Sequence, residues 1–508
     1  MSKRVNSAST PASTKTQALT GTNGRTPEKP RVANGTGDSD VEMGEFEDAW
    51  EDAVESESEV AAVACDSDSD SDAMAMDEDM ENDDGDHGDG EAMDADTKVY
   101  LPGQALGEDE QLEVDNKAYV MLHSLQLRWP CLSFDFVPDP AGVNSVAFPM
   151  TLYAVAGTQA DSPGKNEVVF MKMSQLHRTQ NDDDGDEDDG AVNDDDALDD
   201  DPILETKIIN HQGGVNRVRV SDWQGKPVVA TWADTGKVHI WDASGPTKAL
   251  ATPGYQLPAA ARRPLHTVTS HGRNEGFALD WGAEDGHLLT GDINSDIYLT
   301  QRNAQSGAFV ADRIPFSGHT SSVEDLQWSP SEKTVFASAS ADQTVRIWDC
   351  RQKKRSALNV HAHDSDVNVI TWNTKTAYLL ASGADDGVFS IWDLRTFSSN
   401  QQAKPTPVAT FKWHQSPITS IEWSPHEESV LSVSGADDQA TLWDLSVELD
   451  PEEMQAMNDA AQTEVPPQLL FIHQGQSDIK EAHWHPQRPG VLMSTASSGF
   501  NVYKTISV

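Results

Sequence analysis

From about residue 129 to the C-terminus, short runs of alternating apolar and polar residues are separated by turns rich in Gly, Asp, Ser and Pro. Alternation with a period of two places every second side chain on one face of a strand, so these runs predict short β-strands. Early in this region the pattern predicts four strands, at residues 129–136, 151–157, 167–172 and 203–209. A long polar insertion, residues 178–202, separates the third strand from the fourth.

A longer repeat organises the later strands. The segment 318–349 begins with Gly-His and ends with Trp-Asp, and its pattern recurs along the chain. Three copies keep an interval of 29 residues from His to Trp: His319 to Trp348, His363 to Trp392, and His414 to Trp443. Degenerate copies run from His211 to Trp241 and from His473 to Tyr503. A Gly-His to Trp-Asp repeat of this kind is typical of the four-stranded blades of a WD40 β-propeller.

The closing runs of the repeats predict the number of blades. They fall at residues 239–241, 297–299, 346–348, 390–392, 441–443 and 501–503. Together with the first four strands they give seven blades, so we predict an all-β fold, a seven-bladed WD40 propeller over residues 129–508. The third blade is the weakest copy, because Leu299 stands where the repeat has Trp.

Two short helices are predicted outside the repeats. Residues 115–125 favour an amphipathic helix with Asp115 as its N-cap. Its apolar positions fall at helical spacing: Ala118, Tyr119, Leu122 and Leu125. A second helix is predicted at residues 450–461, because Asp-Pro-Glu-Glu is a capped helix start. Pro466 and Pro467 then end it before a strand at 469–472.

The charge is concentrated in two tracts. The 508 residues include 84 acidic and 36 basic side chains, a net charge of −48. Residues 38–96 hold 26 acids and residues 182–201 hold 13, with no Lys or Arg in either tract. We therefore expect residues 1–98 to be a disordered acidic tail and residues 99–128 to be a linker with a helix. Within the tail, Phe46 and Trp50 form either a motif that orders on a partner or part of a solvated tail.

This charge balance narrows the classes of partner. Direct binding of nucleic acid needs a basic footprint, whereas a strongly basic protein complements the acidic tracts. The only dense basic cluster, residues 351–355, is predicted to be an exposed loop, with a nuclear-import signal as the alternative. Three cysteines (Cys65, Cys131 and Cys350) are too few for a disulfide framework, and no run is long and apolar enough for a membrane span. We expect a soluble intracellular monomer.

The recurring polar residues first suggest catalysis. His319, Ser338 or Ser340, and Asp342 resemble a hydrolase triad. Similar sets recur in other copies, however, whereas an active site needs one special copy, so we predict a hydrogen-bond network that stabilises each blade. These structural positions are His319, Asp342 and Trp348, then His363, Asp386 and Trp392, then His414, Asp437 and Trp443. We predict no enzymatic activity and no cofactor.

Metal binding is not supported by the sequence. The pairs His361/His363 and His483/His485 lack a third convincing ligand. The acidic run 66–72 departs from the EF-hand pattern, because Ser71 occupies the position that requires Gly. We therefore predict no metal site.

Acidic residues are candidates for partner binding in the loops that lead into the blades. Counting six residues back from the Trp of each first strand gives Glu275, Ser322, Asp366, Pro417 and Asp478, and Asp385 lies just before a turn. Equivalent positions in successive blades share one face of a propeller, so these acids are expected to converge there. A random scatter of surface acids explains the pattern equally well.

Several segments resemble known families. Residues 129–135, WPCLSFD, resemble the N-terminal module of the histone-binding WD-repeat proteins of chromatin assembly complexes. Residues 465–473 resemble the loop that, with an N-terminal helix, clamps a histone helix in those proteins. This resemblance implies partner contacts at Tyr119, Leu122, Pro466 and Pro467.

A closer resemblance covers most of residues 98–508. The segments 99–103, 156–160, 276–281, 322–328 and 503–508 are similar to the glutamate-rich WD-repeat family of nucleolar ribosome-assembly factors. The resemblance implies a chaperone that binds a newly made, basic ribosomal protein of the large subunit, universal protein three, and delivers it to pre-60S particles. It also implies a nuclear and nucleolar location with shuttling to the cytoplasm, and it allows histones as alternative partners.

Overall fold

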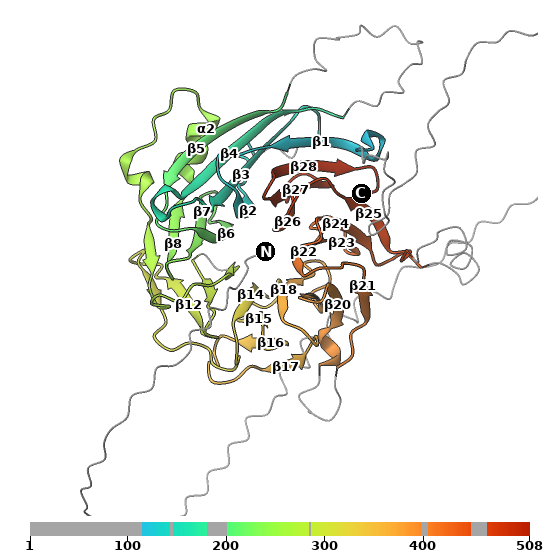
Figure 1. The fold of residues 1–508 in the computed structure, drawn as a ribbon. Helices are drawn as coiled ribbons and strands as arrows, with labels where there is room; N and C mark the ends of the chain where they lie inside the picture. The colour runs from blue at the N-terminus through green and yellow to red at the C-terminus, as the bar shows by residue number, and fades with distance from the viewer. Residues whose placement is uncertain (1–113, 143–145, 180–200, 284–285, 398–404, 449–464) are drawn as a thin grey trace, which may run out of the picture. The chain divides into compact units, whose positions relative to one another are not determined.

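The computed structural model describes residues 114–142, 146–179, 201–283, 286–397, 405–448 and 465–508. These residues belong to one compact unit, Gly88–Val508, and form seven four-stranded antiparallel sheets arranged around an axis (Figure 1). The predicted seven-bladed propeller is therefore confirmed. The predicted acidic tail 1–98, most of the acidic insertion 178–202 and the predicted helix 450–461 lie outside the described residues.

The strands follow one another from blade to blade. Blade 1 contains β2 (Cys131–Phe136), β3 (Met150–Thr158), β4 (Glu167–Leu176) and β5 (Ile203–Asn210). Blade 2 contains β6 (Val215–Asp222), β7 (Pro227–Ala233), β8 (Val238–Asp242) and β9 (His266–Val268). Blade 3 contains β10 (Ala278–Trp281), β11 (Leu288–Gly291), β12 (Ile297–Arg302) and β13 (Phe309–Ala311). Blade 4 contains β14 (Val323–Trp328), β15 (Val335–Ser340), β16 (Thr344–Asp349) and β17 (Leu358–His361).

The last three blades complete the ring. Blade 5 contains β18 (Val367–Trp372), β19 (Leu379–Ala384), β20 (Val388–Asp393) and β21 (Ala409–Lys412). Blade 6 contains β22 (Ile418–Trp423), β23 (Val430–Gly435), β24 (Ala440–Asp444) and β25 (Leu469–His473). Blade 7 contains β26 (Glu481–Trp484), β27 (Val491–Ala496), β28 (Gly499–Thr505) and, as its outermost strand, β1 (Tyr119–Leu125).

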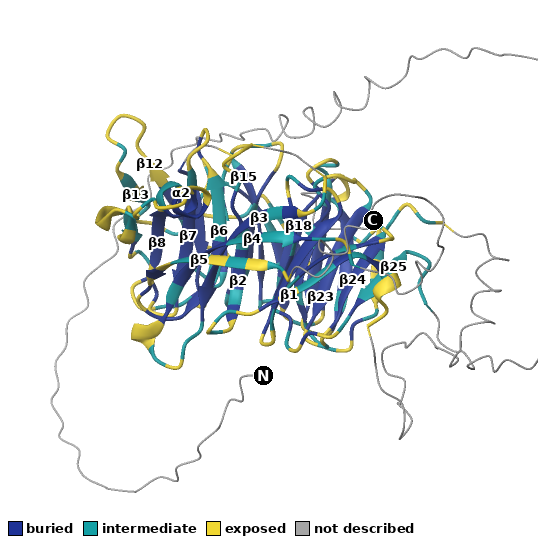
Figure 2. Cartoon of the chain, turned by 90° about the horizontal axis from the view of Figure 1, so that it is seen from above, coloured by how far each residue is buried: buried dark blue, intermediate teal, exposed yellow. Residues whose placement is uncertain are grey.

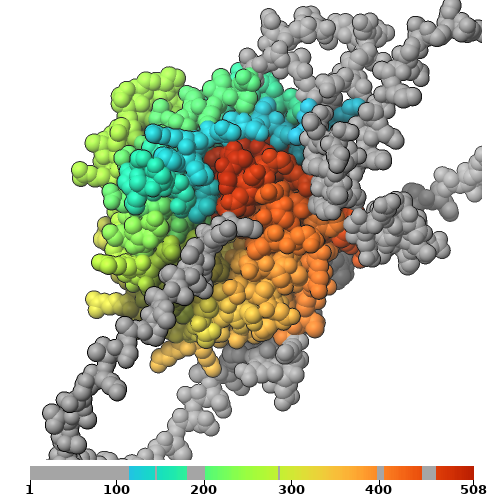
Figure 3. Space-filling model, in the orientation of Figure 1, coloured from blue at the N-terminus to red at the C-terminus, as the bar shows by residue number. Residues whose placement is uncertain are grey.

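Blade 7 joins the two ends of the folded chain. β1 pairs antiparallel with β28, so that Leu122 lies opposite Tyr503. Figure 3 shows the N-terminal blue strand against the C-terminal red blade. The helix predicted at residues 115–125 was wrong, because only a 3-10 turn, η1 (Asn116–Ala118), precedes β1. Asp115 caps that turn by accepting a hydrogen bond from the backbone N–H of Lys117, at 3.0 Å.

The core lies between the blades. The second strand of blades 4, 6 and 7 is buried at every position, because neighbouring blades cover both faces of the sheet (Figure 2). The largest fully buried side chains include Trp348, Trp392, Trp443 and Tyr503, which stand at the closing position of the repeat. Removing a buried aromatic ring of this size costs ~3–5 kcal/mol. Packing therefore explains the regular spacing of these rings along the sequence.

The helical elements are few and short. The described residues contain α2 (Ser244–Ala251) and the 3-10 turns η2 (Pro163–Lys165), η4 (Ala259–Arg262) and η5 (Leu394–Thr396). α2 lies in the connection between β8 and β9 and contacts β4 and β5 of blade 1. Across the described part of the chain, no helix combines the length and apolar character needed to cross a membrane.

Candidate partner-binding surfaces

The recurring His, Ser, Asp and Trp of blade 4 form a closed hydrogen-bond network. The Nδ1 atom of His319 lies 2.9 Å from Asp342 and its Nε2 atom lies 2.6 Å from the hydroxyl of Ser338. The indole N–H of Trp348 donates to the same hydroxyl at 2.8 Å. Burial alone would raise the pKa of Asp342, but hydrogen bonds from His319, Thr344 and the backbone of Thr320 hold it below its usual value. Because each group has a partner inside the blade, the set fits a structural role.

Blades 5 and 6 repeat this network with small changes. His363 and Trp392 share the hydroxyl of Ser382, at 2.7 and 2.8 Å. In blade 6 the shared hydroxyl comes from the next strand instead, since His414 and Trp443 both bond to Thr441. His414 also lies 3.0 Å from Asp437, whereas Asp386 acts on His363 only through its charge.

The weaker copies keep part of the network. His271 in blade 3 lies 2.9 Å from Asp292 and 2.7 Å from Thr290, although Leu299 replaces the Trp. In the last copy, His473 stacks on Tyr503 with ring centroids 4.1 Å apart and bonds to the hydroxyl of Tyr119 at 2.8 Å. Tyr119 therefore ties the first strand to the network of blade 6.

A second polar system, which the sequence analysis missed, lies on the innermost strands. Glu481 of β26 forms ion pairs with Arg217 at 2.5 Å and Arg219 at 3.3 Å, both from β6. It also accepts a hydrogen bond from the backbone N–H of Phe134 in β2, at 3.2 Å. Burial alone would raise the pKa of Glu481, but attraction to the two arginines and the bond to His483 hold it well below its usual value. One carboxylate thus connects blades 7, 1 and 2.

His483 lies between two carboxylates in the same system. Its Nδ1 atom lies 2.9 Å from Glu422 and its Nε2 atom lies 3.2 Å from Glu481. Burial alone would lower the pKa of His483, but the two carboxylates raise it to about 10. His483 is therefore a buried cation. Its sequence neighbour His485 packs against Phe136 with ring centroids 4.4 Å apart, and burial lowers its pKa to about 3.

Carboxylates also join successive inner strands through the backbone. In each case a side chain on one blade accepts a hydrogen bond from a backbone N–H of the next blade. Among the described residues these pairs are Asp135 with Val220, Asp280 with Trp328, Asp325 with Ile370, Glu422 with Trp484, and Glu481 with Phe134. The acids that line the axis thus hold the ring together, and their alternation along the first strand of each blade was the available sequence signal.

The predicted partner-binding acids divide into two groups. Asp366 and Asp385 lie together in blade 5, where the backbone N–H of Asp385 donates to the carbonyl of Asp366 at 2.9 Å. Both side chains are exposed. Burial first and the charge of Asp385 second raise the pKa of Asp366. Glu324 of β14, which the sequence analysis did not select, joins them, because burial and the charge of Asp366 help to raise its pKa against the opposing Arg217. We call Glu324, Asp366 and Asp385 the acidic cluster.

The other predicted acids have partners of their own. Asp478 forms an ion pair with Lys480 at 2.5 Å and accepts a hydrogen bond from Ser497 at 2.9 Å. Glu275 accepts from the side-chain amide of Asn216 at 3.3 Å. The structure therefore brings Asp366 and Asp385 together with Glu324, while Glu275 and Asp478 are engaged separately.

The residues of the predicted clamp lie at the outer edge of blades 6 and 7. Tyr119 is only 6% exposed, and its ring packs edge-on against Phe471 of β25, with centroids 5.2 Å apart. Leu122 is half-buried in the same cluster. Pro466 and Pro467 are also half-buried, and the carbonyl of Pro466 accepts from the backbone N–H of Leu469 at 3.0 Å. β1 and the start of β25 thus form one edge, in which Tyr119 supports the surface and Leu122 remains accessible.

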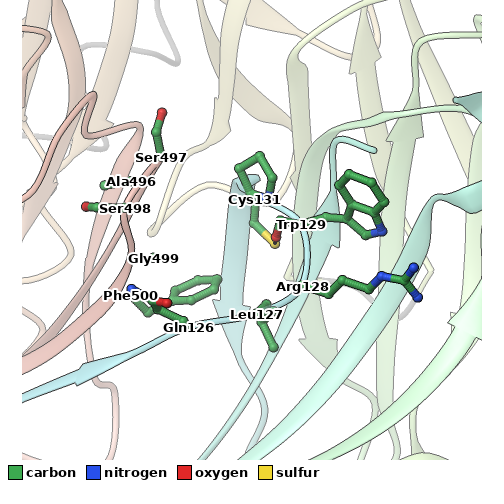
Figure 4. A pocket seen from close by; sticks show the side chains of 11 residues that line it. Gln126, Leu127, Arg128, Trp129, Cys131, Ala496, Ser497, Ser498, Gly499 and Phe500 are labelled. Atoms are coloured by element: carbon green, nitrogen blue, oxygen red, sulfur yellow. The ribbon is translucent and has the colours of Figure 1, made fainter. Parts of the chain in front are cut away.

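A pocket lies where β1 leads into β2, next to the turn between β27 and β28 (Figure 4). Its lining comes from residues 126–131 and 496–500. Gly499 has φ of +121°, and a Cβ atom there would lie 2.5 Å from the carbonyl oxygen of Leu125, so this close approach requires glycine. Trp129 in the lining is flanked by two cations, Arg128 at 5.6 Å and Lys165 at 5.7 Å.

Nothing in the described ranges has the donor set of a metal site. No group of three or more His, Cys, Asp or Glu side chains is arranged there to hold an ion. His361 and His363 do not converge, because His361 is exposed at the end of β17 and His363 belongs to the network of blade 5. The run 66–72 lies outside the described residues.

Comparison with known proteins identifies the family. Residues 109–177 match the family of the histone-binding protein RBBP4, which is also described as a subunit of the CAF1 complex, and residues 313–349, 354–393 and 405–444 match the WD domain, G-beta repeat. The ribosome assembly protein rrb1 of Schizosaccharomyces pombe is 47% identical over 479 residues, which cover 92% of this chain and 94% of that protein. The glutamate-rich WD repeat-containing protein 1 of Dictyostelium discoideum is 49% identical over 420 residues, 80% of this chain and 85% of that protein. The chain belongs to the glutamate-rich WD-repeat family.

A plant relative extends the family. The protein HEAT STRESS TOLERANT DWD 1 of Arabidopsis thaliana is 48% identical over 435 residues, which cover 80% of this chain and 91% of that protein. The predicted resemblance to the glutamate-rich WD-repeat family is confirmed, as is the kinship with the histone-binding WD-repeat proteins through the N-terminal match. A WD40 propeller in this family points to a binding scaffold.

Proposed function

We propose that this protein is a ribosome biogenesis factor that binds a newly made, basic ribosomal protein of the large subunit and delivers it to pre-60S particles. The observation that carries the proposal is the relationship to a ribosome assembly protein over 94% of that protein's length. The client we expect is universal large-subunit protein three. Histones are the alternative client, favoured by the match of residues 109–177 to the histone-binding family.

The charge distribution supports a basic client. The chain carries a net charge of −48, and the acidic cluster places Asp366 and Asp385 on the surface, where neither forms an ion pair with another described residue. Complementary charge speeds encounter and disfavours acidic competitors. A ribosomal protein needs its basic extensions for RNA, so RNA can displace an acidic chaperone by competing for the same side chains. Capture and release then require no catalysis.

The edge formed by β1 and β25 supplies an apolar contact. Leu122, Leu470 and Phe471 are half-buried there, and Val114 and Ile506 are 54% and 66% exposed. An amphipathic helix can place its apolar face on such a surface. We therefore propose that a helix of the client packs on this edge while its basic segments lie on the acidic cluster.

The test measures the affinity of the purified full chain for the ribosomal protein and, separately, for core histones. The variant Asp366→Asn/Asp385→Asn removes two charges from the acidic cluster. The matched control, Glu427→Gln/Glu428→Gln, removes two exposed charges from the turn between β22 and β23. We expect the first variant to bind the ribosomal protein about tenfold more weakly at low salt, with a smaller salt dependence, and the control to bind normally.

Two results would overturn this proposal. Stoichiometric binding of histones without binding of the ribosomal protein would favour the histone alternative. Equal weakening by both variants would mean that general charge, and not this surface, determines affinity. Location follows from the same proposal, so the tagged protein should concentrate in the nucleus and nucleolus and also appear in the cytoplasm.

A further inference from the structure

The outer rim of blades 2 to 4 differs in chemistry from the acidic cluster. It consists of residues 262–265, 310–314 and 354–355, which we call the rim belt. Three of its aliphatic side chains are strongly exposed: Leu265 at 53%, Val310 at 62% and Ile314 at 69%. Large exposed apolar side chains that gather on one surface commonly mark a docking site.

Direct contacts make the three parts of the rim belt continuous. The rings of His266 in β9 and Phe309 in β13 stack with centroids 5.3 Å apart, which joins blade 2 to blade 3. Lys353 joins blade 3 to blade 4, because its carbonyl accepts from the backbone N–H of Ser317 at 3.2 Å and its ammonium group lies 5.2 Å from the ring centroid of Phe316. Lys353 also forms an ion pair with Asp312. Figure 1 places β12 between β8 and β16 along this rim.

The rim belt carries unpaired positive charge. Asp312 is engaged by Lys353, and Asp349 is engaged by Arg351 at 2.7 Å. Within the part of the chain that the structure describes, no ion pair involves the five remaining cations, and all five are exposed. They are Arg262, Arg263, Arg313, Lys354 and Arg355. In a protein with a net charge of −48, such a cluster attracts an acidic partner.

We propose that the rim belt binds an acidic protein segment that carries apolar side chains. Its exposed apolar groups are aliphatic, and a surface for single-stranded RNA would offer aromatic rings for base stacking. The loop 351–355 is anchored by Lys353 and so lacks the free extended form of a simple import signal. A basic client would be repelled here, so the rim belt serves a second partner, independent of the client on the acidic cluster.

The test uses a labelled synthetic peptide with the sequence of residues 41–54, VEMGEFEDAWEDAV, as an acidic probe with apolar side chains. Its affinity for the full-length protein is measured by fluorescence anisotropy. Arg313→Glu/Lys354→Glu reverses two charges in the rim belt, whereas Lys375→Glu/Lys412→Glu makes the same change at exposed positions of blade 5. We expect at least tenfold weaker binding for the first variant and a change below twofold for the second.

A third variant separates apolar contact from charge. Val310→Ser/Ile314→Ser keeps every cation and is expected to weaken peptide binding at least threefold, with an unchanged circular dichroism spectrum. Equal loss in the rim-belt and blade 5 charge variants would overturn the proposal, as would an unchanged affinity in the serine variant. Binding of single-stranded oligouridine that depends on Arg313 and Lys354, without binding of the peptide, would assign the surface to RNA instead. Affinity for the basic client should stay unchanged in all three variants, so this test is separate from that of the proposed function.

Discussion

Glu481 and Arg217 form a buried ion pair between two blades that are not neighbours in the ring. Their side chains are 3% and 11% exposed, and the inner strand of blade 1 lies between their strands in the ring order. The same carboxylate binds the backbone of that intervening strand. Blade 7 contains both ends of the folded chain, so this pair strengthens the ring beside its point of closure.

Glu481→Gln should destabilise the protein strongly. The substitution leaves Arg217 and Arg219 buried without their counter-charge, and breaking a buried pair in this way costs ~3–5 kcal/mol. Urea unfolding would measure the loss. The control Glu205→Gln removes the exposed ion pair with Lys172 and should change the free energy of unfolding by less than about 0.5 kcal/mol. Similar losses in the two variants would contradict the role of the inner pair.

The stability of the ring should fall at high pH because of His483. The pKa of His483 is raised to about 10 in the folded protein, compared with ~6.5 in an unfolded chain. A raised pKa stabilises the fold fully below pH ~6.5, and that contribution is lost as the pH rises through about 10. Unfolding free energies measured from pH 6.5 to 10 should therefore decline more steeply in the natural protein than in His483→Gln. Parallel pH profiles would show that the charge of His483 does not contribute.

How much of this architecture can be predicted depends on how local each signal is. The strands around His319 and Trp348 follow from a local repeat, because each four-stranded blade forms from consecutive residues. The acidic network around Glu481 could not be predicted in the same way. It depends on which inner strands are brought together by ring closure, and Glu481 lies more than 260 residues from Arg217 in sequence.

The first strand shows the same limit. Ala118, Tyr119, Leu122 and Leu125 fit a helical spacing, yet the residues that are fully covered in β1 are Tyr119, Met121 and Leu125. Their alternation is interrupted by a register shift between Tyr119 and Met121, which obscures the period of two. Pairing with β28, some 380 residues away, decides the outcome, and local propensity does not contain that information. The site residues divided similarly, since Asp366 and Asp385 came from the repeat position whereas Glu324 required the neighbouring blade.

Closure by β1 predicts a specific sensitivity near the N-terminus. Met121 is fully buried in a cluster with Phe134 and Phe500, so Met121→Ala should cost ~2–5 kcal/mol and expose the closing blade to proteases. The matched control is Ser124→Ala, whose hydroxyl makes only an exposed hydrogen bond to Asn501. Thermal melting and limited proteolysis would compare the two. Equal melting temperatures would mean that β1 is not needed to close the ring.

The blade network predicts a change in stability without a change in function. In blade 4 the carboxylate of Asp342 holds the proton on Nδ1 of His319, so the hydroxyl of Ser338 donates to Nε2 and accepts from the indole of Trp348. Ser338→Ala leaves both ring nitrogens buried and unpaired, which should cost about 2–4 kcal/mol in total. Ser317→Ala, at an exposed position, is the control and should melt normally.

Client binding distinguishes a purely structural role of this network from a direct role in recognition. If Ser338 and His319 only stabilise the blade, Ser338→Ala will bind the ribosomal protein with natural affinity at temperatures well below its melting point. Because a folded variant keeps the acidic cluster intact, calorimetry at 10 °C should give the same dissociation constant for both proteins within about twofold. A folded variant that loses binding would assign a direct role to this network, and the similarity of the sets in blades 4, 5 and 6 would then need another explanation.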